Sequence, residues 1–417
     1  MKIKIMLFIM LLTLAKGADT TIDLIKRSQK IPSINVTYFD NKFSNQALRI
    51  YKILLGDLNI SGHFLVKEGG KGEDFPKYAD LSRKADLFAN LRINQEGNTY
   101  KVAMRLFDVN NQSLVLDKIY IMEDPRLYPF VAHKMTIDIN NYIEAPSIDW
   151  MKRYVLFSAY IKPGKTNIFI GDYTLTYRKL IQSDGLNLFP KWANNEQSEI
   201  YYTKIIDNRA VIIRYNIYTG TSARIIDSQG MAVVSSVSKD SKSLLLTLAP
   251  VSDPDIYLFN VDTKKSKKMT KYKGIDVSGN FVNDDKSMVF VSDRLGYPNI
   301  FVKDLEQNAP IEQVVYHGKN NSSVSSYKDY VVYASRETNN VFGQNTFNLY
   351  LISTKSDFIR RLTTNGVNQL PRFSADGGSI MFIKTLRNQS ALGIVRLDYN
   401  KTFLFPFKGA QIQGFDW

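Results

Sequence analysis

The stretch "LPRFSADGGSIMFIKT", Leu370–Thr385, decides the fold. An aromatic residue, Phe373, precedes a Ser-Ala-Asp-Gly-Gly turn, and the apolar run Ile380–Ile383 follows it. Ser and Asp side chains can hydrogen-bond the backbone of a tight turn, and glycine accepts a positive φ, so the stretch predicts a β-hairpin. A single hairpin is common, and the fold depends on whether the chain repeats it.

Related hairpins recur through the last two-thirds of the chain, each with an apolar anchor before a polar turn. The anchors are Trp150, Trp192, Val237, Phe281, Val324, Phe373 and Trp417, which step by 42, 45, 44, 43, 49 and 44 residues. A regular period of this length without a helical pattern predicts about four short strands per repeat, the composition of a β-propeller blade.

The repeat around Phe281 shows the expected strands. Strand A ends at Phe281, and strands B, C and D follow at Ser287–Val291, Asn299–Lys303 and Glu312–Tyr316. Six sets of B, C and D strands fit between residues 153 and 405, which predicts six blades.

Each anchor residue marks one strand A, so seven anchors predict seven A strands. Only six sets of B, C and D strands are present, and one strand A is therefore left without a set. An open edge strand would expose unpaired backbone groups. We therefore expect Gln411–Trp417 to supply the inner strand of the blade formed by residues 153–180, with Ser147–Trp150 as a linker.

The region before the repeats mixes helix and strand patterns. Apolar residues at three- and four-residue steps predict helices over Phe43–Leu58 and Leu127–Tyr142, the second opened by Pro125. Alternating segments predict strands, at Ile31–Phe39, Leu87–Ile93, Tyr100–Phe107 and Leu114–Ile121. The sequence thus predicts a multidomain chain: a small N-terminal α/β domain at 18–144 with a mostly antiparallel sheet, then a six-bladed β-propeller at 145–417.

The N-terminus has the pattern of a secretory signal. Lys2 and Lys4 precede the apolar stretch Ile5–Leu14, and Ala15-Lys16-Gly17 supplies small residues for cleavage. We expect residues 1–17 to be a signal peptide cut after Gly17, with Ala18 as the alternative position. No later stretch approaches 18 apolar residues, and without cysteine there is no lipid attachment site, disulfide or thiolate metal site.

Composition narrows the function. The formal charge of +14 favours acidic surroundings such as cell-wall polymer, a membrane surface or acidic proteins. The signal peptide and the lack of any nucleic-acid motif argue against nucleic acid. His63, His133 and His317 are far apart in the sequence, and we expect satisfied or solvated histidines. No metal site and no cofactor is predicted.

A resemblance to a known family rests on a second recurring element. The segment "SDRLGYPNIFVKDL", Ser292–Leu305, places an Asp-Arg-x-Gly-x-Pro turn before an apolar strand, and Phe-Ser-x-Asp-Gly precedes strand B at Phe373. These motifs resemble the TolB propeller repeat. The order of signal peptide, small α/β domain and propeller is also that of the TolB family, and "AHKMTIDIN" at 132–140 looks like part of its first domain.

The resemblance implies a function. A TolB-like protein is a periplasmic, non-catalytic scaffold of the Tol–Pal system, which maintains outer-membrane integrity and constriction at cell division. Its partners would be the lipoprotein Pal at the propeller and TolA at the N-terminal region, with other outer-membrane or peptidoglycan-associated proteins beyond them. The resemblance assigns TolA contact to the start of the mature chain: Ala18, Asp19, Thr20, Thr21, Ile22 and Asp23.

Topology indicates where a partner would bind the propeller. B–C and D–A loops share one face, and the short A–B turns lie on the other. Longer polar loops are available for recognition, and the resemblance places Pal at the same mouth. The candidate partner-binding residues are Asn187, Asp276, His317, Asn320, Asn321, Asn368 and Gln369 from D–A loops, and Asp293, Arg294, Tyr297 and Arg336 from B–C loops.

Two other classes of function stay open. Related propellers precede peptidase domains of the prolyl oligopeptidase type, but the sequence has no Gly-x-Ser-x-Gly elbow, no His-Glu-x-x-His helix and no Rossmann fingerprint. We therefore expect no enzymatic activity. The third class is a periplasmic propeller that binds a glycan or small ligand in its central channel.

Overall fold

The computed structural model describes residues 31–417 except 40–43, 75–84, 307, 342–344 and 388. The predicted signal peptide at 1–17 and the segment Ala18–Asp23, predicted to contact TolA, therefore lie outside the described residues. None of the described helices is long and apolar enough to cross a membrane.

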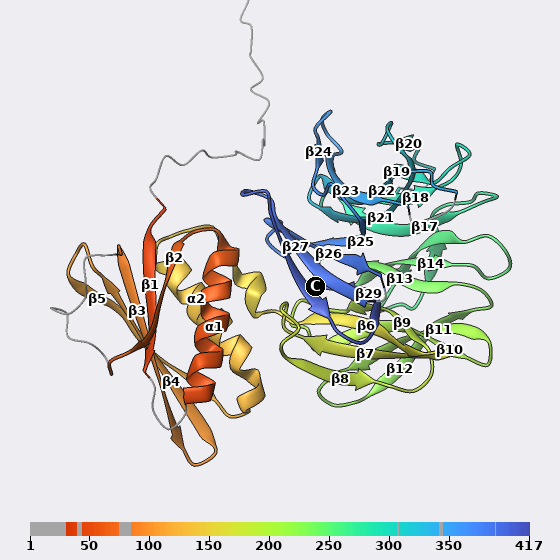
Figure 1. The fold of residues 1–417 in the computed structure, drawn as a ribbon. Helices are drawn as coiled ribbons and strands as arrows, with labels where there is room; N and C mark the ends of the chain where they lie inside the picture. The colour runs from red at the N-terminus through yellow and green to blue at the C-terminus, as the bar shows by residue number, and fades with distance from the viewer. Residues whose placement is uncertain (1–30, 40–43, 75–84, 307, 342–344, 388) are drawn as a thin grey trace, which may run out of the picture. The chain divides into compact units, whose positions relative to one another are not determined.

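The N-terminal domain is a five-stranded sheet with two helices packed on one face (Figure 1). Its elements are β1 (Ser33–Phe39), α1 (Ser44–Ser61), β2 (Leu65–Gly72), β3 (Leu87–Glu96), β4 (Thr99–Asp108), β5 (Ser113–Met122), the 3-10 turn η2 (Pro125–Leu127) and α2 (Tyr128–Tyr142). The apolar helical faces predicted from the sequence are buried: Ile50, Leu54 and Leu58 of α1 have no exposed surface. Both helix predictions are confirmed.

The prediction of a mostly antiparallel sheet is only partly correct, because two of the four strand pairings are parallel. The strand order is β2-β1-β3-β4-β5, and β1 pairs in parallel with both β2 and β3. Only the β3-β4-β5 meander is antiparallel. The reason is that α1 carries the chain back along the sheet between β1 and β2, which makes these two strands parallel. Strand β2 itself was missed, because its sequence "LVKEGGKG" is mostly exposed and lacks the alternation of a buried strand.

The rest of the chain forms antiparallel four-stranded units. In each unit the innermost strand, strand A, comes first and strands B, C and D follow outward, as the hairpin pattern predicted. The units are β9–β12 (Asn187–Trp192, Glu199–Ile206, Arg209–Asn216, Ser222–Ser228), β13–β16 (Ala232–Val237, Ser243–Leu248, Asp255–Asn260, Ser266–Lys268), β17–β20 (Asp276–Val282, Ser287–Ser292, Asn299–Asp304, Ile311–Gln313), β21–β24 (Lys319–Tyr327, Tyr330–Arg336, Phe347–Ser353, Ile359–Arg361) and β25–β28 (Val367–Phe373, Ser379–Leu386, Gln389–Arg396, Lys401–Phe407).

Two details of these units refine the sequence prediction. Strand β20 ends at Gln313 rather than at Tyr316, because only its first residues pair with β19. Units β21–β24 and β25–β28 join in one sheet through a single parallel pair, Phe347 with Val367. This region of the chain is a β-propeller fold.

The last unit combines the two ends of the repeat region. Strand β29 (Gln411–Asp416) pairs antiparallel with β6 (Val155–Lys162), and β7 (Lys165–Gly171) and β8 (Arg178–Gln182) complete the sheet. The predicted pairing of the C-terminal stretch with residues 153–180 is therefore confirmed. Trp417 packs edge-on against Trp150 of the 3-10 turn η3 (Asp149–Lys152), with ring centroids 5.3 Å apart.

The structure of the hairpin turn between β25 and β26 shows why this turn requires aspartate and glycine. The carboxylate of Asp376 accepts hydrogen bonds from the Ser374 hydroxyl and, at 3.0 Å, from the Gly378 amide. Gly377 has a φ of +77°, and a Cβ there would lie 2.3 Å from the Tyr327 ring. Only glycine fits, which is why this turn keeps its Asp-Gly sequence.

Candidate partner-binding mouth and central channel

Four of the candidate residues lie at or near the start of inner strands, not in the D–A loops as predicted, and are fully buried. Asn187, Asp276, Asn321 and Asn368 have 0% of their surface exposed. The amide of Asn187 donates to the carbonyls of Thr166 (3.1 Å) and Asp184 (2.9 Å). Asn368 likewise donates to Phe347 (3.0 Å) and Asn365 (2.8 Å). These side chains hold the D–A loops in place, and none of them can touch a partner without a change of conformation.

Asp276 holds a neighbouring B–C loop. Both of its carboxylate oxygens accept from Arg294 Nη2 at 3.0 Å, and the Arg294 guanidinium lies 5.1–5.4 Å from the rings of Tyr272, Phe290 and Phe301. Asp293 accepts from the Ile275 amide at 2.8 Å. A half-buried guanidinium held by a carboxylate and three rings has little freedom to reorient. Asp293 and Arg294 thus tie one B–C loop to the adjacent D–A loop.

Three other candidates come together at the start of β21. The Tyr333 hydroxyl and His317 Nε2 are 2.8 Å apart, and the His317 ring lies 5.0 Å from that of Tyr350. Burial lowers the pKa of His317. With the Asn320 amide oxygen turned toward Arg336, it accepts from Arg336 Nε at 3.2 Å and Nη2 at 2.5 Å. These residues, with Tyr297 and Gln369, are half-buried, and Asn320, Arg336 and Gln369 lie within strands and not in loops.

Sequence reasoning missed the apolar side chains on these loops. Val251, Val341 and Tyr316 are 91%, 82% and 81% exposed. Leu295, Ile275 and Met231 are also exposed. All six lie in B–C or D–A loops, so they belong to the same face as the candidate residues. Their position in loops, and not in strands, was the signal available in the sequence. Contiguous apolar surface marks protein interaction sites, and these side chains supply exposed apolar surface on the loop face.

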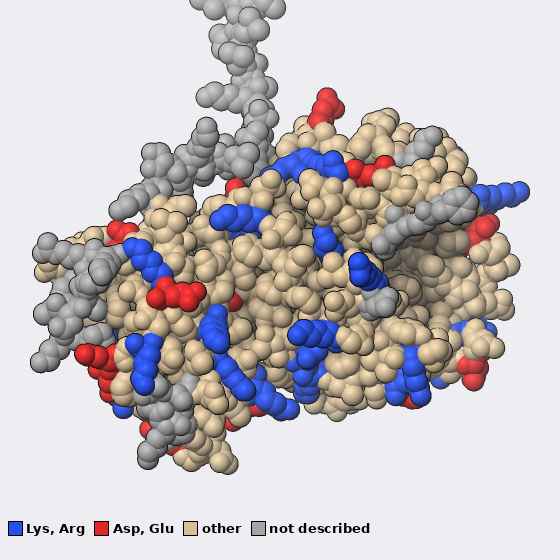
Figure 2. Space-filling view, in the orientation of Figure 1, with Lys and Arg blue, Asp and Glu red and all other residues tan. Residues whose placement is uncertain are grey.

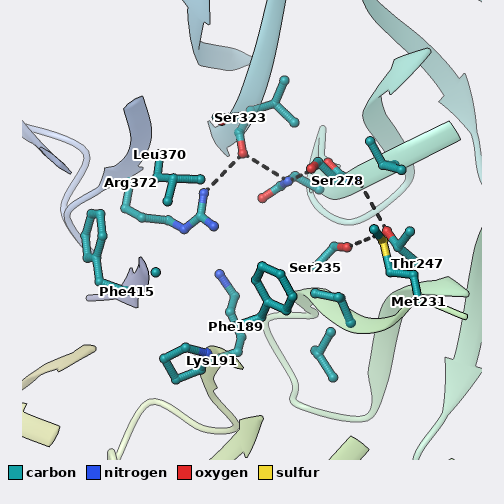
Figure 3. A pocket seen from close by; sticks show the side chains of 17 residues that line it. Phe189, Lys191, Met231, Ser235, Thr247, Ser278, Ser323, Leu370, Arg372 and Phe415 are labelled. Carbon is teal, nitrogen blue, oxygen red and sulfur yellow. Dashed lines mark hydrogen bonds between the residues drawn. The ribbon is translucent and has the colours of Figure 1, made fainter. Parts of the chain in front are cut away.

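The inner strands also line a cavity of about 200 Å³ (Figure 3). Its wall contains residues of β9, β17, β21, β25 and β29, and of β13 with the residue before it. Lys191 and Arg372 both extend into it. Lys191 Nζ lies 2.8 Å from Asp416 Oδ1, and Arg372 Nε lies 3.7 Å from the same oxygen.

The charged groups in this cavity are only partly exposed to solvent. Burial lowers the pKa of Lys191; the Asp416 carboxylate opposes this shift, and the nearby Arg372 charge adds to it. Burial also lowers the pKa of Arg372, again against the effect of Asp416. The side chains retain 14% and 19% of their surface, because the cavity itself can hold water.

Comparisons with known proteins agree with this architecture. The family model of the TolB beta propeller domain matches residues 154–417, and that of the TolB amino-terminal domain matches residues 20–115. The Tol-Pal system protein TolB of Wolinella succinogenes is 49% identical over 409 residues, which cover 96% of each chain. That of Helicobacter pylori strain HPAG1 is 48% identical over 403 residues, again 96% of each chain.

The chain belongs to the TolB family. Among solved structures, TolB from Acinetobacter baumannii superposes with a TM-score of 0.77 over 93% of this chain and 96% of that one, at 21% identity. Two-domain order and propeller fold are therefore shared with a distant TolB.

A buried ionic cluster links the first domain to the propeller in this TolB-family protein. His133 of α2 places Nδ1 2.7 Å from Asp57 Oδ2 of α1, and Nε2 3.4 Å from Asp172 Oδ2, just after β7. The Tyr173 hydroxyl donates to the other oxygen of Asp57. Burial alone would lower the pKa of His133, but the charges and hydrogen bonds of Asp57 and Asp172 raise it to about 9. The histidine is held as a cation between two carboxylates.

Apolar contacts surround this junction. Gly62 and His63, at the end of α1, pack on Tyr399, and the His63 and Tyr399 rings are 5.6 Å apart. Phe130 lies against Tyr154 and Tyr177, with ring centroids 5.0 Å and 5.6 Å away. Within the described residues, no group of three or more His, Cys, Asp or Glu side chains could hold a metal ion.

Proposed function

We propose that this protein is a non-catalytic periplasmic scaffold of the Tol–Pal system, whose propeller binds Pal and whose N-terminal region binds TolA. Membership of the TolB family supports the assignment to the system. The observation that carries the Pal site is the loop face, where exposed apolar side chains lie among polar ones. In this account the protein helps to keep the outer membrane attached and constricting at division.

The proposal includes a ring of six blades. Six groups of four strands support it, since strands from each of them line one cavity. The pairing of β29 with β6 supports closure of the ring by the C-terminus. In the same proposal, the signal peptide comprises residues 1–17, the first domain residues 18–144 and the propeller residues 145–417.

Pal recognition is assigned to two kinds of residue on the mouth. His317, Asn320, Arg336, Tyr297 and Gln369 offer polar atoms, and exposed Val251, Leu295, Tyr316 and Val341 offer apolar surface. The remaining candidates act by shaping loops: Asn187, Asp276, Asp293, Arg294, Asn321 and Asn368. Arg and Tyr are enriched among residues that dominate interface energies, so Arg336 and Tyr316 should contribute most.

Charge adds long-range attraction. Basic side chains are spread over the visible face of the molecule (Figure 2), and the whole chain has a formal charge of +14, three of which come from Lys2, Lys4 and Lys16 of the proposed signal peptide. An acidic partner surface would be steered toward such a protein, at rates that fall as salt is added. A partner that presents an acidic surface is thus expected to bind faster at low ionic strength.

The test is a binding measurement with purified Pal. Arg336→Ala with Tyr316→Ser should weaken Pal binding at least tenfold, because interface anchors are each worth about 2 kcal/mol or more. Leu404→Ser is the matched control, since Leu404 is an exposed apolar residue on outer strand β28. All variants should keep the circular dichroism spectrum. Unchanged Pal binding by the double variant would move the site elsewhere.

TolA binding has a separate test. Removal of residues 18–23 from the mature protein should abolish capture of TolA and leave Pal binding intact. A pulldown from envelope extract distinguishes the other classes: glycan recovered without Pal would support the ligand-binding propeller, and peptide hydrolysis would support the peptidase-related reading.

A further inference from the structure

The ionisable groups in the central cavity do not balance in charge. Lys191 and Arg372 both reach into the cavity, and Asp416 is the carboxylate that pairs with them (Figure 3). Asp416 Oδ1 serves both cations, at 2.8 Å and 3.7 Å, while Oδ2 accepts from the Trp192 amide at 2.9 Å. The three groups together carry a net charge of +1, and the carboxylate is already engaged.

Arg372 keeps capacity to donate. Its Nη1 donates to the carbonyls of Pro371 (3.0 Å) and Val324 (3.3 Å). Its Nη2 is not buried and, among the residues that the structure describes, has no hydrogen-bond partner. A guanidinium is a planar fork of five N–H donors that matches a carboxylate. An added carboxylate would supply the missing acceptor.

The rest of the wall limits what else could enter. Most of the lining is apolar, with Phe189, Met231, Val277, Leu370 and Phe415 beside a few hydroxyl groups. A volume of about 200 Å³ leaves space for a few heavy atoms. A cation would be repelled by two positive side chains, and a dianion would exceed their net charge. A short apolar chain with one negative end fits both the charge and the wall.

We propose that the channel binds a small monocarboxylate, with its carboxylate between Lys191 and Arg372 and its short apolar tail along the inner strands. The site lies near the ends of β9, β25 and β29 that lead to the A–B turns, away from the loop face proposed for Pal. It is independent of the proposed partner binding. The lowered pKa of Lys191 fits a site that lacks a negative charge.

The first experiment uses the unaltered mature protein and calorimetric titration. Butyrate should bind at millimolar concentration, and butyramide, its neutral isostere, should bind at least about tenfold more weakly, since charge-assisted hydrogen bonds are roughly twice as strong as neutral ones. Absence of butyrate binding, or equal binding of the two compounds, would overturn the proposal without any mutation.

The second experiment changes the charge of the site in both directions. Lys191→Met should weaken butyrate binding, whereas Lys179→Met, on outer strand β8, should leave it unchanged. Asp416→Asn raises the net charge of the site from +1 to +2. Butyrate should then bind roughly tenfold more tightly, a gain of about 1.4 kcal/mol, because the negative charge of Asp416 no longer repels the carboxylate of the ligand. A purely structural ionic cluster would give no gain in affinity, and that result would contradict the site.

Discussion

Two buried ionic clusters of this molecule have opposite charge balance. At the junction of the domains, one cation, His133, lies between two carboxylates, Asp57 and Asp172, and all three are essentially unexposed. In the channel, two cations share one carboxylate beside a cavity. The junction has a surplus negative charge and is sealed from water, which suits a permanent contact. The channel has a surplus positive charge and space, which suits a ligand.

The largest predicted effect comes from the strand that supplies the channel carboxylate. Deletion of residues 411–417 removes β29, an inner strand, and also the Trp417 contact with Trp150. Cooperative thermal unfolding should be lost or its midpoint lowered severely, because β6 would become an open inner edge. Gln413→Ala, at an exposed position of β29, is the control and should unfold like the parent protein. An unchanged melting temperature after deletion would refute closure by this strand.

The next effect tests the sealed junction. Asp57→Ala leaves His133 and Tyr173 without their acceptor in a site that water does not reach. The free energy of unfolding should fall by about 3–5 kcal/mol, as for other broken buried pairs. Denaturant titration measures it, with Asp149→Asn at an exposed pair as a control expected to change stability by less than about 1 kcal/mol. If Asp57→Ala and Asp149→Asn lowered the free energy of unfolding equally, the distinction between a buried and a solvated ion pair would be refuted.

The two clusters also predict opposite responses to pH. The pKa of His133 is raised from 6.5 to about 9, so the folded state holds its proton more tightly. The stabilisation is complete below pH 6.5 and should be lost as pH rises toward 9, by about 3 kcal/mol in all. His133→Gln should abolish this loss of stability at alkaline pH, as measured by denaturant titrations. If the free energy of unfolding of His133→Gln depended on pH as in the parent protein, the loss would belong to another group.

The pKa of Lys191 is lowered, so its contribution has the reverse sign. Here the unfolded state holds the proton more tightly, and stability should rise with pH as the buried ammonium loses its charge, up to the unfolded value of 10.5. Lys191→Met should flatten that rise. A steeper alkaline loss in the variant than in the parent protein is therefore expected, and a shallower one would contradict the assignment.

The smallest effect concerns the channel carboxylate. Asp416→Asn should cost only about 1–2 kcal/mol of stability, less than Asp57→Ala, because water in the cavity can solvate Lys191 and Arg372. Chemical denaturation of both variants under one buffer provides the comparison. A larger loss for Asp416→Asn than for Asp57→Ala would show that the channel cluster is the more tightly sealed of the two.

Much of the fold could be predicted because its signals are local. The anchors, polar turns and apolar runs repeat at a fixed period, and each hairpin is specified by neighbouring residues. The apolar faces of α1 and α2 were equally easy to predict, because apolar residues recur there at three- and four-residue steps. Strand β2 was missed because an exposed strand with adjacent glycines has no local pattern, and the parallel pairing of β1 depends on tertiary packing.

The candidate site was harder to read from the sequence. Asn187 and Asn368 were chosen because polar loop residues are usually exposed, but their amides satisfy backbone carbonyls and are buried. Asp57, His133 and Asp172 are far apart in sequence, as are Lys191, Arg372 and Asp416, so their contacts exist only once the chain has folded. Sequence polarity alone therefore could not separate buried residues that shape a loop from half-buried residues near the loop face.

The most direct test of the account is hydrogen–deuterium exchange of the mature protein with and without Pal. The account predicts that Pal protects the B–C and D–A loops, in particular residues 249–254, 293–298, 314–318 and 337–341, while the A–B turns such as 374–378 exchange as before. Protection confined to the A–B turns or to the N-terminal domain would contradict it.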